Sequence, residues 1–101
     1  EYAKRISPAI EFWDNMYKTV RGNDEKTDYI RWACLHNIVQ AYYWMDDFDM
    51  AREYAFKMSE VPINSSQSRR LLNMIEDTVL RLNRVGVKSQ HIDLRRLNKF
   101  V

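Results

Sequence analysis

Residues 37–62 read NIVQAYYWMDDFDMAREYAFKMSEVP, and this stretch decides the fold. Apolar residues recur at the three- and four-residue spacing of a helix up to Met45, and again from Ala51 onward. Between the two runs, the aspartates of residues 46–49 offer side-chain hydrogen bonds that compete with a helical backbone. We predict that Asp49 caps the second helix and that Pro62 ends it. Because the connection is so short, the two helices must fold back on each other as an antiparallel hairpin.

Further helices are predicted before this hairpin. Ser7-Pro8 combines a capping hydroxyl with a proline at the first helical position, where the missing N–H costs nothing. A helix is therefore expected over residues 8–21, with Gly22 as its stop. Thr27 is the predicted cap of the helix that leads into the quoted stretch.

Helical spacing continues after the hairpin. The serines of the loop at residues 63–68 predict the cap of a helix that runs to about Arg84, before Gly86. A shorter amphipathic helix is expected after Ser89. No segment alternates apolar and polar residues for long enough to propose a strand. The sequence thus predicts an all-α fold of antiparallel helical hairpins, with four to five helices.

Length and composition fit one small domain spanning residues 1–101. The chain has 101 residues, of which only two are Gly and two Pro, and no apolar run approaches the roughly 18 residues that cross a bilayer. The single cysteine, Cys34, cannot form an internal disulfide and is predicted to be a buried thiol. No targeting segment opens the chain, and because it begins with Glu1 we expect a piece of a longer protein. The compartment stays open.

The hairpin resembles a divergent tetratricopeptide repeat. Such repeats are helix-turn-helix units of about 34 residues whose consensus reads W-x2-L-G-x2-Y, then A-x3-F, then P. The resemblance is clearest over residues 32–64, where Tyr42 and Ala51 stand in the consensus register, Phe48 supplies the aromatic of the turn, and Pro62 follows. The consensus tryptophan, small residue and helix-ending glycine are replaced by Leu35, Val39 and Asp46. The resemblance implies a short right-handed superhelix or a bundle.

The same resemblance implies a binding function. In this family the first helices of the hairpins line a concave groove that receives a peptide or another protein. Carried over residue by residue, the groove positions that face a partner are His36, Asn37, Gln40, Tyr43 and Trp44. Tyr and Trp are enriched at interfaces, whereas amide and imidazole groups exchange hydrogen bonds with a peptide backbone. The alternative is that Tyr43 and Trp44 simply pack on a neighbouring helix.

Catalytic and cofactor chemistry find no support in the sequence, so we expect a protein that is not an enzyme and needs no cofactor or metal. An EF-hand loop counted from Asp46 would place Ala51 and Lys57 where glycine and glutamate are required. Cys34 and His36, two residues apart on a helix, point to different faces. No phosphate-binding glycine loop or zinc spacing occurs.

A second hypothesis follows from the uneven charge. Residues 1–65 carry a net charge of −3, and residues 66–101 carry +5. This predicts a basic face that binds nucleic acid or an acidic partner, although acidic residues interrupt it. Its members are Arg69, Arg70, Arg81, Arg84, Arg95 and Arg96. A third possibility is a structural spacer module of a larger bacterial surface, regulatory or secretion protein.

Overall fold

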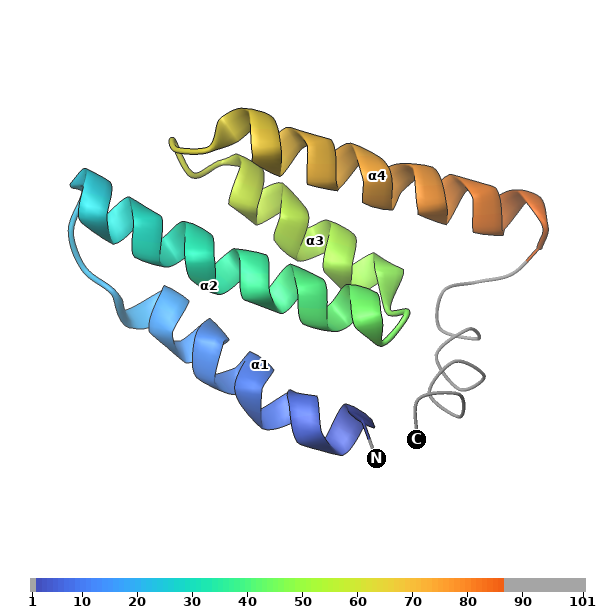
Figure 1. Cartoon of the computed structure of the whole chain (residues 1–101), viewed down its shortest axis with the longest axis horizontal. Coiled ribbons are helices and arrows are strands. Elements are labelled where there is room, and N and C mark those ends of the chain that lie inside the picture. Colours follow the sequence, from blue (N-terminus) through green and yellow to red (C-terminus); the bar gives the residue numbers. More distant parts are fainter. Residues whose placement is uncertain (1, 87–101) are drawn as a thin grey trace.

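The computed structural model describes residues 2–86 as four α-helices, with side chains from residue 5 onward. The helices are α1 (Tyr2–Thr19), α2 (Glu25–Trp44), α3 (Phe48–Ser59) and α4 (Ser65–Arg84). Successive helices run antiparallel, so that α2 and α4 point in the same direction (Figure 1). The all-α fold predicted from the sequence is confirmed, and residues 2–86 contain no strand. The helix expected after Ser89 lies outside the described residues.

The predicted start of the first helix is wrong. α1 begins at Tyr2 and contains Pro8 in its second turn, so Ser7 is not its cap. A proline at this place removes the backbone hydrogen bond to the carbonyl of Lys4. The extra turn is stabilised by packing, because Ile6 lies one turn before the buried Ile10 and contacts the same core.

Three predicted caps are also wrong, each by a few residues. Asp24 caps α2 by accepting a hydrogen bond from the backbone N–H of Thr27 at 2.9 Å, so Thr27 is the partner of the cap. Asp47 caps α3 by accepting from the Met50 N–H at 3.3 Å, while Asp49 stands in the first turn. The cap of α4 is Asn64, in the left-handed region at φ 50° and without a side-chain bond. The clusters of polar residues in the sequence located each turn. They did not show which polar residue caps the helix that follows.

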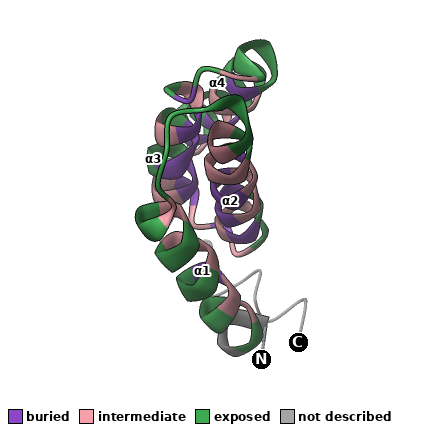
Figure 2. Cartoon of the chain, turned by 90° about the vertical axis from the view of Figure 1, so that its left-hand side faces the viewer, coloured by how far each residue is buried: buried purple, intermediate pink, exposed green. Residues whose placement is uncertain are grey.

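The core lies on the two central helices. α2 packs against α1 on one side and α3 on the other, and α4 packs against α3. Buried positions gather in α2 and α3, whereas the outer sides of α1 and α4 are exposed (Figure 2). Residues without exposed surface include Leu35, Ile38 and Met58. Cys34 is buried, as predicted, and burial raises the pKa of its thiol.

One polar contact joins α1 to α3. The hydroxyl of Tyr54 donates a hydrogen bond to the carboxylate of Asp14 at 3.1 Å, and Lys18 pairs with the same carboxylate at 2.7 Å. Burial raises the pKa of Asp14, but the hydrogen bonds from Lys18 and Tyr54 outweigh it and hold the pKa below its usual value. Burial, and then the bond to Asp14, raise the pKa of Tyr54 to about 12. The contact therefore needs an ionised aspartate and a protonated tyrosine.

We expect Tyr54→Phe to lower the free energy of unfolding by about 1 kcal/mol at neutral pH, because one charge-assisted hydrogen bond is lost. The difference from the unsubstituted chain should shrink above pH 10, the ordinary pKa of tyrosine, and vanish as the pH passes the raised value near 12. It should also shrink in acid as the pH falls through the lowered pKa of Asp14. Urea denaturation of both chains across this pH range measures it. A difference that does not vary with pH would show that the hydroxyl acts through packing alone.

None of the helices within residues 2–86 is long and apolar enough to cross a membrane.

Candidate binding groove between α2 and α4

A buried polar contact joins α2 to the first turn of α4. The indole N–H of Trp32 donates a hydrogen bond to the hydroxyl of Ser68 at 2.8 Å, and that hydroxyl in turn donates to the carbonyl of Asn64 at 3.1 Å. Trp32 is 8% exposed and Ser68 is fully buried. The small serine lets α4 approach the indole closely at this end.

A groove separates the same two helices farther along. It has a volume of about 710 Å³. The wall on α2 consists of Val39, Gln40, Tyr43 and Trp44, and the floor includes Phe48 at the start of α3. The wall on α4 consists of Leu71, Met74, Thr78, Arg81, Leu82 and Val85. Most of this lining is apolar, and Trp44, Met74 and Val85 are exposed to solvent.

Three of the five groove residues predicted from the sequence lie together in this wall. Gln40, Tyr43 and Trp44 share one face of α2 at positions i, i+3 and i+4. The ring of Tyr43 meets that of Phe48 edge-on, with centroids 5.1 Å apart, so its orientation is fixed by the floor. Trp44 is 56% exposed. The wall therefore combines an aromatic ring packed on the floor, an exposed aromatic ring and an amide.

The other two predicted residues do not line the groove. His36 is half-buried and stacks on Trp32 with ring centroids 4.9 Å apart. Burial lowers the pKa of His36, so the imidazole is mostly neutral at pH 7. Asn37, the next residue, is half-buried as well. His36 belongs to the contact that holds α2 to α4, one turn before the groove begins.

The sequence reasoning missed most of the α4 wall. Met74, Thr78, Arg81 and Val85 recur at intervals of three and four residues, which places them on one helix face. This face is offset from the buried stripe that contains Ile75 and Val79. This second set of residues at helical spacing, beside the buried stripe, was the sequence signal that could have predicted the α4 wall.

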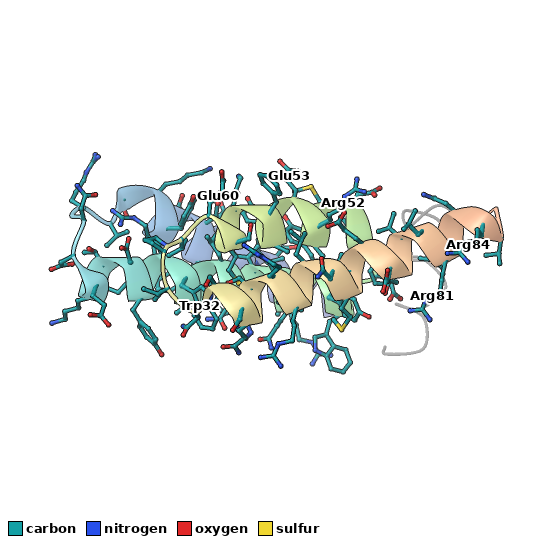
Figure 3. All side chains as sticks on the ribbon, turned by 90° about the horizontal axis from the view of Figure 1, so that it is seen from above. Trp32, Arg52, Glu53, Glu60, Arg81 and Arg84 are labelled. Atoms are coloured by element: carbon teal, nitrogen blue, oxygen red, sulfur yellow. The ribbon has the colours of Figure 1, made fainter. Side chains whose placement is uncertain are left out.

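The predicted basic face is only partly visible in the structure. Arg69, Arg70, Arg81 and Arg84 are all exposed on α4, and Figure 3 shows Arg81 and Arg84 near its C-terminal end. Arg81 is also part of the groove wall. It makes no ion pair within the part of the chain that the structure describes. Arg95 and Arg96 lie outside the described residues, and binding of nucleic acid or an acidic partner by this face stays a prediction.

Of the aspartates around the α2–α3 turn, Asp46 lines the groove. Asp46 is buried and adopts a left-handed backbone with φ 60°. Burial raises the pKa of Asp47 and the nearby charge of Asp49 adds to the effect, while the hydrogen bond from Met50 opposes it. Within residues 5–86, no group of three or more His, Cys, Asp or Glu side chains is arranged to hold a metal ion. The aspartates of this turn are therefore explained by their structural role, in which Asp47 caps α3.

Comparisons with known proteins find no family model, no curated protein and no solved structure that matches this chain.

Proposed function

We propose that the protein binds a peptide or a segment of another protein in the groove between α2 and α4, and that the α2–α3 hairpin is a divergent tetratricopeptide repeat. One observation carries the proposal. Gln40, Tyr43 and Trp44, which the repeat resemblance assigns to a partner-binding face, line the largely apolar groove. Exposed apolar surface that borders a groove is typical of interaction sites on proteins.

The direction of the helices supports the repeat assignment. In the proposed repeat arrangement α2 and α4 take the place of first helices, and the two helices run parallel (Figure 1). In tetratricopeptide repeats it is the first helices that line the concave face. α3, as the second helix of its hairpin, supplies only Phe48 to the groove floor.

The lining indicates the chemistry of the bound segment. The aromatic and aliphatic walls suit a ligand with large apolar side chains, which lose contact with water when bound. Arg81, Gln40 and Thr78 add a cation, an amide and a hydroxyl to the apolar lining, and Asp46 lies at the same groove. An acidic side chain or a terminal carboxylate next to the apolar anchor would pair with Arg81. We therefore propose an apolar peptide segment that carries a carboxylate.

A peptide selection tests this function. Random peptides displayed on phage are selected on the 101-residue chain, and the affinities of the enriched peptides are then measured by fluorescence anisotropy. We expect Trp44→Ala to weaken their binding at least about tenfold, because an exposed aromatic anchor is lost. Since Trp44 is 56% exposed, the free energy of unfolding should fall by no more than about 1 kcal/mol.

The matched control is Tyr29→Ala. Tyr29 lies on the same helix and is also 56% exposed, but it is not part of the groove wall. Its removal should leave the peptide affinity unchanged. The proposal is overturned if no peptide is enriched, or if the enriched peptides bind the Trp44 and Tyr29 variants equally well. Loss of helicity in Trp44→Ala by circular dichroism would instead place Trp44 in the core.

A further inference from the structure

A second groove lies between α3 and α4, on the other side of α4. Its volume is about 700 Å³. α4 contributes Leu72 and Glu76, and α3 contributes five residues that include Phe56, followed by its C-cap residue Glu60. Figure 3 shows Arg52, Glu53 and Glu60 along α3, on the side of α4 away from Arg81. The two grooves share no lining residue.

Phe56 is the apolar centre of this second groove. It is 58% exposed, although the buried Ala55 precedes it and the buried Met58 follows two residues later. The half-buried Leu72 on α4 lines the same groove. An exposed aromatic ring beside a leucine offers an anchor point to a partner side chain.

Acidic groups surround this centre. Asp49, Glu53 and Glu60 on α3 and Glu76 on α4 line the groove, against the cations Arg52 and Lys57. Lys57 is engaged inside the protein, because its ammonium lies 4.6 Å from the centroid of the Tyr54 ring. Glu53, Glu60 and Glu76 make no ion pair with any other residue of the described region. The rim therefore has a net negative charge of which three carboxylates are open to a cationic ligand.

We propose that the α3–α4 groove docks a basic amphipathic helix of a partner protein. A helix laid along the groove would place apolar side chains, spaced three and four residues apart, against Phe56 and Leu72. Lysine or arginine on one of its flanks would meet Glu53 and Glu60, and on the other flank Glu76. Charge complementarity selects this partner over an acidic one. The proposal is independent of the α2–α4 groove.

Two synthetic helical peptides serve as probes, one of leucine and lysine and one of leucine and glutamate in the same pattern. With the 101-residue chain, we expect fluorescence anisotropy to show binding of the lysine peptide that weakens as salt is added, and no binding of the glutamate peptide. Phe56→Ala should weaken the lysine peptide about tenfold. Phe12→Ala, on α1 and 59% exposed, should not.

Charge variants separate local docking from general attraction. The double variant Glu53→Lys and Glu60→Lys should lose the lysine peptide and gain the glutamate peptide. The control pair Glu11→Lys and Glu25→Lys changes the net charge by the same amount at two exposed sites on other helices. Equal effects of the two pairs, or equal binding of both peptides to the unsubstituted chain, would overturn the proposal.

Two other occupants of the α3–α4 groove can be distinguished by experiment from the proposed partner helix. A chain that dimerises in sedimentation experiments, and becomes monomeric with Phe56→Ala, would assign the groove to a second copy and overturn the proposed partner. Neutralising Arg95, Arg96 and Lys99 with glutamine tests the chain's own basic residues. If that variant binds the lysine peptide more tightly than the unsubstituted chain does, those residues compete for the groove and the proposed partner is again overturned.

Discussion

Trp32→Ala is expected to lower the free energy of unfolding by about 4 kcal/mol, the largest effect of any substitution considered for this protein. The side chain is 8% exposed, so truncation leaves a large cavity between α2 and α4. It also removes the ring on which His36 stacks and leaves the Ser68 hydroxyl without its indole donor. Because a small domain has a stability of roughly 5–15 kcal/mol, this loss is a large part of the total. Urea denaturation followed by circular dichroism measures the change.

Two companions separate packing from hydrogen bonding. Trp32→Phe keeps most of the apolar burial and loses the indole N–H, and should cost about 1–2 kcal/mol. Tyr29→Ala removes an aromatic ring one turn earlier that is 56% exposed, and should cost less than about 1 kcal/mol. If Trp32→Ala costs no more than Tyr29→Ala, then the contact with Ser68 does not hold the two helices together.

The hairpin could be predicted because its signals are local. Residues 37–62 alternate between helical apolar spacing and an aspartate-rich turn, and these fix the order and direction of two helices without any distant contact. The residues that cap the helices could not be predicted with the same success. Asp24 and Thr27 bond to each other, so composition alone does not tell which is the cap and which is the partner. The start of α1 depended on tertiary packing of Ile6, which outweighs the usual preference of Pro8 for a first turn.

The residues that α2 contributes to the candidate groove could be predicted from the sequence, whereas most of those on the α4 side could not. Gln40, Tyr43 and Trp44 could be predicted through the resemblance to a tetratricopeptide repeat over residues 32–64. Met74 and Val85 lie on an exposed side of an amphipathic helix, where scattered apolar residues are normal. They line the candidate groove because α4 packs on α3 and because the hydrogen bond between Trp32 and Ser68, 36 residues apart, joins α4 to α2. Such a pairing between distant residues has no periodic signature in a single sequence.

Ala51→Leu is expected to lower the free energy of unfolding by about 3 kcal/mol, at the upper end of the usual cost of overpacking. Ala51 has no exposed surface, and it stands on the hairpin formed by α2 and α3, which pack together. A larger side chain must push the two helices apart or force neighbouring side chains out of their rotamers. Thermal and urea denaturation measure the loss.

Arg52→Leu is the matched control, because it introduces the same side chain one residue later on the same helix. Arg52 is exposed, so the free energy of unfolding should change by no more than about 0.5 kcal/mol. Comparing the two variants separates the effect of limited space at position 51 on stability from the effect of the helix propensity of leucine, which is high in both variants. Equal stability of the two variants would mean that free volume exists beside Ala51. The small residue would then not be needed for close helix packing, and the physical basis for aligning Ala51 with the alanine of the tetratricopeptide repeat would be lost.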